Sequence, residues 1–483
     1  MKKICYLLFS LFLCSSVAGA SGVGDGVSNS KKTAGKSDRT TAGWTTIVNG
    51  DMWVDSDGKD VQAHGAGFLK VGDTWYMIGE DRSDMWHPDV NMYSSKDFVN
   101  WKFECKIISP DTHPALADGS RFIERPKLMY CKKTGKYVVW CHWEQGNYGA
   151  SEAAVFYCDS VNGPYKFHWA GRPLGIKSRD CNVFVDDDGT AYFISTTNEN
   201  QDLGLFKLSD DYLSAVSHTT LFAGDRREAP AIVRVGNTYF MLSSACTGWD
   251  PNQCKVAHSK SLTSGWSELS DVGNNIAFDT QAASVLKIPN KNGFSYLYVG
   301  DRWQDPDLPS SKTIVFPIEF KDGKCIFDYR RTFDMNWKTG EWKSSAPENV
   351  ISKRGWKLRG YSSQETEAEQ CEAYKAIDGD FKTMWHAKYS SPAPFPHYLE
   401  VDMGRVYDVS AFLCTPRSDK SSGGLIRGYK LEVSMDGIAW TEVSGGKWMP
   451  YFTKVGFDKT KARYFRFTAF SRDASIAEFD MIQ

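Results

Sequence analysis

Five short segments of this sequence each begin with a polar residue and then become apolar. They read QAHGAGFLKV from residue 62, ERPKLMY from 124, RDCNVFVDD from 179, REAPAIVRV from 227 and TQAASVLKI from 280. The polar residues at their heads are Gln62 or His64, Glu124, Asp180, Glu228 and Gln281. Carboxylates gathered at one place raise each other's pKa, which prepares one of them to act as an acid near neutral pH. Such a cluster suits acid and base chemistry on a neutral polyol.

Each polar segment is followed by a glycine-containing turn and an aromatic-rich run. These runs read VGDTWYMIGED from residue 71, TGKYVVWCHW from 134, DGTAYFISTT from 188, VGNTYFMLSS from 235 and NGFSYLYVGD from 292. They recur at intervals of roughly 50 to 60 residues, which suits one four-stranded sheet per repeat. The sequence therefore predicts an all-β fold with a five-bladed β-propeller. An open meander or a sandwich is the alternative.

In a propeller the polar segments would be the innermost strands, and their heads would converge at one end of the axis. An isolated aspartate at a strand head is most often a turn or cap residue, but the repetition favours a site. Glu124 and Glu228 each precede a dipeptide that ends in proline, Arg125-Pro126 and Ala229-Pro230. A residue before proline is biased to extended geometry, which agrees with strand entry.

Length and composition limit the function classes. The chain has 483 residues, more than one core usually serves, so two domains are expected. A net charge of -2 and the lack of a basic block argue against nucleic acid as a partner. The 12 cysteines show no metal-ligand spacing, so we expect no zinc site. A monomer is expected, and no cofactor for catalysis.

The N-terminal segment MKKICYLLFSLFLCSSVAGA is typical of a secretory signal, which we assign to residues 1–20. Its apolar run is too short to span a membrane. A lipid anchor on Cys14 is an alternative, although Leu13 before it is bulky. Residues 21–43 contain mainly Gly, Ser, Thr and Lys and are predicted to be a flexible linker. We therefore expect a bacterial protein that is periplasmic, secreted or at the cell surface.

The REAPAI and RDCNVFVDDDGTAYF segments, spaced as they are, resemble glycoside hydrolase family 43 over about residues 44–320. The resemblance implies a five-bladed propeller, here residues 44–345, that cleaves glycosidic bonds with inversion. It implies that Glu228 is the general acid and that Asp180 tunes and orients it. In inverting enzymes the acid and the opposite catalytic group lie roughly 6.5 to 9.5 Å apart.

The first-blade segment QAHGAG lacks the aspartate that usually serves the family as base. Together with ERPK and TQ, this departure resembles the exo-β-1,3-galactanase branch, subfamily 24 or the related subfamily 34, in which a glutamine stands on the face from which water attacks. Gln281 matches that glutamine. The remaining matches are Glu124 and Glu80 as sugar-holding glutamates and Tyr148 and Trp249 as pocket aromatics, and we add His64 as a candidate substrate contact.

From about residue 351 the chain resembles the discoidin-like β-sandwich of coagulation factor 5/8 type C domains and family 32 carbohydrate-binding modules. YKAIDGDFKTMWHAKY, PHYLEVDMGRVYDVSAFLCTPR, YKLEVSMDGIAW and ARYFRF carry this resemblance. It implies a β-sandwich over residues 351–483 that binds a galactose-type sugar through His386 and Arg417. It also implies a structural calcium loop, whose oxygen ligands suit this hard cation, formed by Asp378, Asp380, Thr383 and Glu478.

These observations predict an exported inverting glycoside hydrolase, an exo-β-1,3-galactanase that releases galactose from β-1,3-galactan or arabinogalactan of plant type. A β-galactofuranosidase or an α-L-arabinofuranosidase of the same family is one alternative. A non-catalytic glycan-binding protein is another, because the usual base is absent. The retained cluster of Glu228, Asp180 and Glu124 argues against that last alternative, since clustered carboxylates are costly without a catalytic use.

Overall fold

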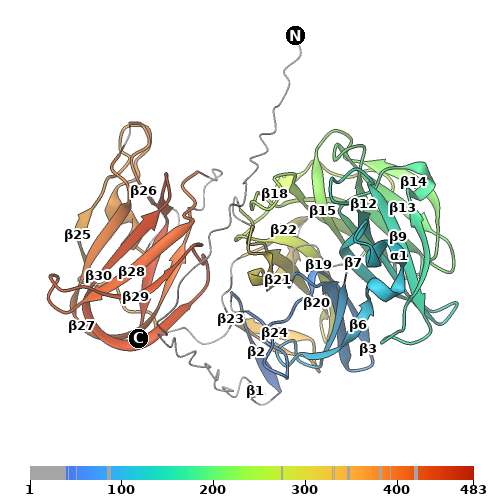
Figure 1. Ribbon diagram of the computed structural model, residues 1–483, viewed down its shortest axis with the longest axis horizontal. Coiled ribbons are helices and arrows are strands. Elements are labelled where there is room, and N and C mark those ends of the chain that lie inside the picture. Colours follow the sequence, from blue (N-terminus) through green and yellow to red (C-terminus); the bar gives the residue numbers. More distant parts are fainter. Residues whose placement is uncertain are drawn as a thin grey trace, which may run out of the picture. The chain divides into compact units, whose positions relative to one another are not determined.

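The structure, a computed structural model, describes residues 40–483 except 42, 51, 84–88, 274–275, 322, 329, 331, 345–348, 380–382, 392 and 418–422 (Figure 1). The predicted signal and most of the predicted linker lie outside the described residues. Residues 40–483 form one compact unit. Within the described ranges the fold is built from β-strands, and the one α-helix there, α1 (Pro114–Ala117), has four residues. No helix in this part of the chain is long and apolar enough to cross a membrane.

Five antiparallel four-stranded sheets follow one another along the chain. The first contains β3 (His64–Val71), β4 (Thr74–Glu80), β5 (Val90–Ser95) and β6 (Lys102–Ile108), and the second β7 (Phe122–Cys131), β8 (Lys136–Glu144), β9 (Glu152–Cys158) and β10 (Lys166–Gly171). The third contains β11 (Cys181–Val185), β12 (Ala191–Thr197), β13 (Asp202–Leu208) and β14 (Ala215–Leu221). The fourth contains β15 (Arg227–Val235), β16 (Thr238–Ala245), β17 (Lys255–Ser259) and β18 (Ser270–Asp271), and the fifth β19 (Gln281–Asn290), β20 (Gly293–Arg302), β21 (Lys312–Lys321) and β22 (Lys324–Ile326).

The first strands of these sheets form the inner ring of the propeller. β3, β7, β11, β15 and β19 contact one another in cyclic order, and β19 returns to β3. Side-chain bonds tie the ring together: Asn182 on β11 donates to the carbonyls of Pro230 (2.9 Å) and Ala283 (3.0 Å), and Ser284 on β19 donates to Ala66 (2.9 Å). The predicted five-bladed propeller and its innermost strands are therefore confirmed.

An additional sheet lies beside the first and last blades. It consists of β1 (Thr40–Thr41), β2 (Trp44–Val48), β23 (Thr332–Asn336) and β24 (Glu341–Ser344). Ile47, Phe333 and Met335 share a core with residues of blades one and five. The side chain of Asn49 donates a hydrogen bond to the Val315 carbonyl at 2.6 Å and accepts one from the Val315 N–H at 2.8 Å. In the described part of the chain, the blades exchange no strand with one another. The two ends of the propeller chain are instead joined by this sheet, which pairs β2 with β23.

The C-terminal part is the expected β-sandwich. Its six-stranded sheet contains β25 (Lys357–Tyr361), β27 (His397–Thr415), β30 (Val455–Phe470), β28 (Gly428–Ser434), β29 (Thr441–Gly446) and β32 (Glu478–Ile482), which pairs with β27. β26 (Trp385–His386) and β31 (Ser475–Ile476) form a second, short sheet. Trp385, Phe412 and Phe467 are fully buried in the core. Register shifts in the long pair β27 and β30 let these strands bend around that core.

Candidate active site

A β-bulge follows the polar strand head in several blades. The register shifts after His64 in β3, after Glu124 in β7 and after Glu228 in β15. Arg125 and Ala229 have φ of 49° and 50°, so the extended geometry expected before proline is wrong at both positions. The bulge explains this, since it bends the strand and redirects a side chain. Backbone in such sparsely populated regions costs about 1–3 kcal/mol and is typical of functional sites.

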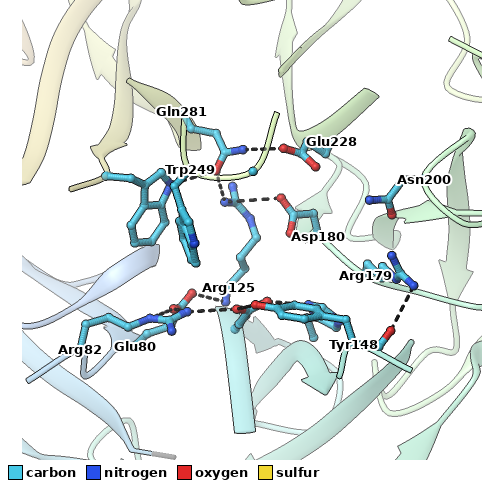
Figure 2. Close-up of a pocket in the computed structure, with 14 residues that line it drawn as sticks. Glu80, Arg82, Arg125, Tyr148, Arg179, Asp180, Asn200, Glu228, Trp249 and Gln281 are labelled. Atoms are coloured by element: carbon cyan, nitrogen blue, oxygen red, sulfur yellow. Dashed lines mark hydrogen bonds and ion pairs between the residues drawn. The ribbon is translucent and has the colours of Figure 1, made fainter. Parts of the chain in front are cut away.

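Glu228 lies beside Gln281, and both side chains are partly buried (Figure 2). The amide Nε2 of Gln281 donates to Glu228 Oε1 at 3.1 Å. Burial raises the pKa of Glu228, the negative charge of Asp180 raises it further, and the result is about 8. Glu228 is therefore protonated at neutral pH, as a general acid must be.

The amide of Gln281 is held in one orientation. Its oxygen accepts hydrogen bonds from Arg125 Nη1 (3.2 Å) and Trp303 Nε1 (3.0 Å). Both partners can only donate, so the amide oxygen must face them and the NH₂ group must face Glu228. Since the NH₂ group cannot accept, Glu228 Oε1 receives a hydrogen bond and the acidic proton is left to Oε2. Gln281 thus orients the acid.

Glu124 is paired with positive and donor groups. His142 Nδ1 lies 3.0 Å from Glu124 Oε2, while Tyr148 Oη (2.8 Å) and Arg82 Nη2 (3.1 Å) donate to Oε1. Burial raises the pKa of Glu124, but these partners outweigh it and lower the pKa to about 2. Glu124 is an ionised acceptor suited to sugar hydroxyls. We expected it to raise the pKa of Glu228 together with Asp180, but its charge is compensated locally.

Glu80 ends β4 and connects the first blade to the second. Its Oε1 accepts the backbone N–H of Arg125 at 2.7 Å, and its Oε2 accepts Nε of Arg82 at 2.6 Å. Burial raises the pKa of Glu80, against the opposing charge of Arg82. The side chain of Arg125 reaches the other way and lies 3.8 Å from Asp180 Oδ2. Arg125 therefore links Glu80 in the first blade to Asp180 and Gln281.

These side chains line one cavity of about 240 Å³ at the inner-strand heads. The structure brings together seven of the eight propeller residues that the sequence singled out: Glu80, Glu124, Tyr148, Asp180, Glu228, Trp249 and Gln281. His64 is the exception. It is 1% exposed and does not line the cavity; its Nε2 is 3.2 Å from Gln62 Oε1, and its ring lies 5.8 Å from that of the lining residue Trp303. His64 is therefore a support for the pocket wall, in place of the direct sugar contact expected.

Sequence reasoning missed seven other lining residues. These are Arg82, Arg125, His142, Arg179, Asn200, Gly248 and Trp303. A usable signal existed for His142, which lies on the second strand of its blade and pairs with the strand head Glu124 in the β7–β8 register.

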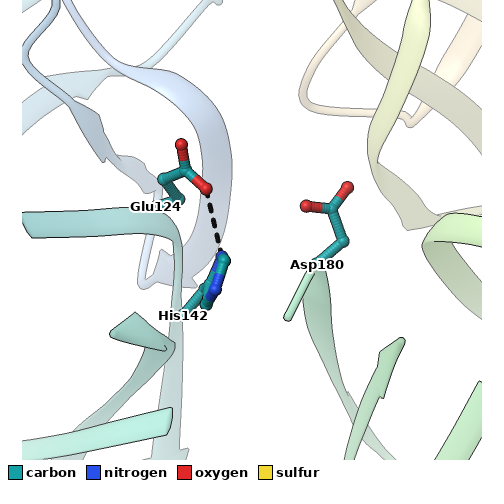
Figure 3. A group of neighbouring side chains, drawn as sticks. All are labelled: Glu124, His142 and Asp180. Atoms are coloured by element: carbon teal, nitrogen blue, oxygen red, sulfur yellow. Dashed lines mark ion pairs between the residues drawn. The ribbon is translucent and has the colours of Figure 1, made fainter. Parts of the chain in front are cut away.

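Three side chains of the site lie close enough together to hold a metal ion: ligand atoms of Glu124, His142 and Asp180 are within 4.8 Å of one another (Figure 3). Their other contacts argue against that use. Arg82 and Tyr148 already donate to Glu124, and the guanidinium of Arg125 lies beside Asp180. Because these cations and donors compensate the carboxylates, the group is an ion-paired cluster that does not suit a metal ion.

The distance between Glu228 and Gln281 differs from the one expected for an inverting enzyme. The acid and the residue opposite it were expected to be roughly 6.5–9.5 Å apart, to leave room for a water. Glu228 and Gln281 are instead in direct hydrogen-bond contact at 3.1 Å. Attack by water from the side of Gln281 would require this hydrogen bond to open when the sugar enters.

Comparison with known proteins identifies the propeller. The sequence profile of glycosyl hydrolases family 43 matches residues 63–324, more than half of the chain. The chain belongs to this family. It is a glycoside hydrolase of an inverting family. The profile of the F5/8 type C domain matches residues 360–479.

Several solved structures resemble this family 43 hydrolase. An exo-β-1,3-galactanase from Clostridium thermocellum is 33% identical, with 75% of this chain and 83% of that chain covered and a TM-score of 0.61. One from Phanerochaete chrysosporium, solved with galactose, is 25% identical over 90% and 100%, with a TM-score of 0.69. Among curated proteins, galactose oxidase from Gibberella zeae is 32% identical over 29% of this chain, which spans only 22% of that protein.

In the sandwich, His386 and Arg417 face the same glycine pair. Arg417 Nη1 donates to the carbonyl of Gly423 at 3.1 Å, and a Cβ at Gly424 would lie 2.7 Å from His386 Nε2. Burial lowers the pKa of His386, and the charge of Arg417 lowers it further. The structure thus brings the two predicted sugar contacts together. Residues 418–422 lie outside the described residues.

One of the expected calcium ligands, Glu478, forms an ion pair with a lysine. Asp380 lies outside the described residues, and Thr383 Oγ1 donates to Asp378 at 2.8 Å. Glu478, 1% exposed, is paired with the ammonium of Lys353, which is also 2.9 Å from Asp480. Glu478 in this arrangement does not fit a calcium ligand, because a protein cation already compensates its charge.

We predict that chelating calcium leaves the melting temperature of the protein nearly unchanged, whereas Lys353→Met destabilises it by about 3–5 kcal/mol. The reason is that removing the ammonium of Lys353 leaves the charge of the buried Glu478 uncompensated. Differential scanning calorimetry with and without a chelator would measure both effects. Lys357→Met, at an exposed lysine of the same domain, is the control. A large loss of stability of the unchanged protein in chelator would contradict the prediction.

Proposed function

We propose that this hydrolase is an exo-β-1,3-galactanase that removes single galactose units from the non-reducing end of β-1,3-galactan or arabinogalactan. The observation that supports this function most directly is the pairing of the protonated Glu228 with the oriented amide of Gln281. A carboxylate base is missing from the head of β3, where the chain reads QAHGAG. This combination matches the galactanase branch of the family, and the 33% identity to a bacterial exo-β-1,3-galactanase supports the same choice.

The pocket composition agrees with an exo-acting enzyme. The cavity of about 240 Å³ is small and is bounded by the buried ion pairs of Arg82 with Glu80 and Glu124. The ionised carboxylate of Glu124 and the guanidinium of Arg82 offer a fixed acceptor and donor to the hydroxyls of one terminal sugar, and Trp249 offers an aromatic face. We further propose that the protein acts outside the cytoplasm, because the N-terminal segment has the pattern of a secretory signal.

The test is a substrate panel. The purified protein should release galactose from β-1,3-galactan and β-1,3-galacto-oligosaccharides, shortening them by one unit at a time, as anion-exchange chromatography would show. Aryl galactofuranosides and arabinofuranosides should be hydrolysed at least about 100-fold more slowly, since their five-membered rings present hydroxyls at different positions to fixed polar groups. Preferred cleavage of a furanoside would establish the alternative specificity. Binding of galactan without any release of sugar would establish a non-catalytic glycan-binding protein.

A further inference from the structure

A second cavity, of about 330 Å³, adjoins the candidate active site. Trp249 and Trp303 line both cavities, so these two side chains form a shared wall. The far side of the second cavity is formed by residues of the sandwich, among them Leu425, Arg427 and Trp448. A bound polymer that extends from the active site past the two tryptophans would therefore contact the C-terminal domain.

Buried contacts hold this wall of the sandwich against the propeller. Arg302 at the end of β20 is 1% exposed and donates to the Tyr451 carbonyl (3.0 Å) and to Thr453 Oγ1 (2.7 Å). Phe278 packs edge-on against Phe452, with ring centroids 5.6 Å apart. Because the guanidinium and Phe452 are buried in these contacts, the segment that follows Trp448 has a fixed place beside the active site.

The second cavity combines aromatic faces with polar groups. The rings of Trp249 and Trp303 are 5.0 Å apart and inclined by 66°. The guanidinium of Arg427 lies 4.9 Å from the ring centroid of Trp448 and donates to Asp250 Oδ1 at 2.8 Å. Aromatic rings pack against the apolar faces of sugars, and charged groups bond their hydroxyls. This lining suits a carbohydrate.

We infer that this second cavity binds the sugar units that follow the terminal galactose toward the reducing end of the β-1,3-galactan chain. The inference rests on the proposed function, since it takes the first cavity to hold that galactose. Its specific content is that Trp448 and Arg427, in the C-terminal domain, are binding residues for the substrate of the propeller. The sandwich then contributes to the catalytic efficiency of the enzyme on long substrates.

The experiment compares Trp448→Ala and Arg427→Ala with the unchanged full-length protein. On β-1,3-galactotriose and longer oligosaccharides we expect kcat/KM to fall about tenfold in each variant, the effect of one lost aromatic or charged contact. On an aryl β-galactoside, whose single sugar fills the first cavity, kcat/KM should stay within about twofold. The melting temperature should change little, since the ion pair of Arg427 with Asp250 is solvent-exposed.

Arg463→Ala is the matched control. Arg463 also pairs with a carboxylate, Asp402, and lies over an aromatic ring, that of Tyr464, at 5.1 Å, but it lines neither cavity. This variant should have the same kcat/KM as the unchanged protein on every substrate. Equal kcat/KM of Trp448→Ala and the unchanged protein on every chain length would overturn the inference while leaving the proposed function intact. No release of galactose by the unchanged protein would overturn both.

Discussion

Replacing Glu228 by glutamine should lower kcat on β-1,3-galacto-oligosaccharides by about 10²–10⁴-fold, the usual contribution of a positioned general acid. The amide has the shape of the acid but no proton to give to the departing glycosidic oxygen. An aryl galactoside with an acidic phenol needs little protonation, so its hydrolysis should fall far less. Initial rates on both substrates measure the difference. A variant that cleaves natural galactan at the original rate would exclude Glu228 as the acid.

The same assignment predicts a pH dependence. Glu228 must be protonated to act, and its pKa is raised to about 8 by burial and by the charge of Asp180. kcat/KM should therefore be retained on the acidic side of pH 8 and fall about tenfold per pH unit above it. Asp180→Asn removes a charge that raises this pKa, so the alkaline limb should move to lower pH. An unchanged limb in Asp180→Asn would contradict the coupling.

Replacing Gln281 by alanine should remove most of the turnover, at least about 100-fold in kcat, with a smaller effect on KM. An amide is too weak a base to take a proton from water in the ordinary way, so Gln281 can only orient the water or pass a proton by shifting to its imidic acid form. Its NH₂ group also sets which oxygen of Glu228 carries the proton. Both contributions act mainly in the transition state, which lowers kcat more than binding.

Two measurements separate this role from simple sugar binding. Trp303→Phe keeps an aromatic ring but removes the N–H that donates to Gln281 Oε1, and it should lower kcat by about tenfold. Proton NMR of the first-formed galactose should show the α anomer from a β-linked substrate, as inversion demands. Near-normal turnover of Gln281→Ala would make the glutamine a binding residue and place the base elsewhere around the axis.

The sequence alone was sufficient to predict the propeller and half of the residues that line its pocket. Strand alternation and turn chemistry are local properties, so each glycine-containing turn and the aromatic strand after it could be predicted without tertiary information. Five similar repeats then imply a ring, and a ring places equivalent positions such as Glu124, Asp180 and Glu228 at one end. These residues could be grouped because symmetry, rather than any contact between them, relates their positions.

The connections between those positions were decided only by the tertiary structure. Arg125 reaches Gln281 across 156 residues and so links blade two to blade five, and His142 compensates Glu124 from the neighbouring strand. The burial of His64 and the participation of Trp448 beside the active site also depend on how the blades and the sandwich close around them. The physical reason is that pKa values, amide orientation and cavity walls arise from groups that are distant along the chain. No local pattern encodes which of them will meet.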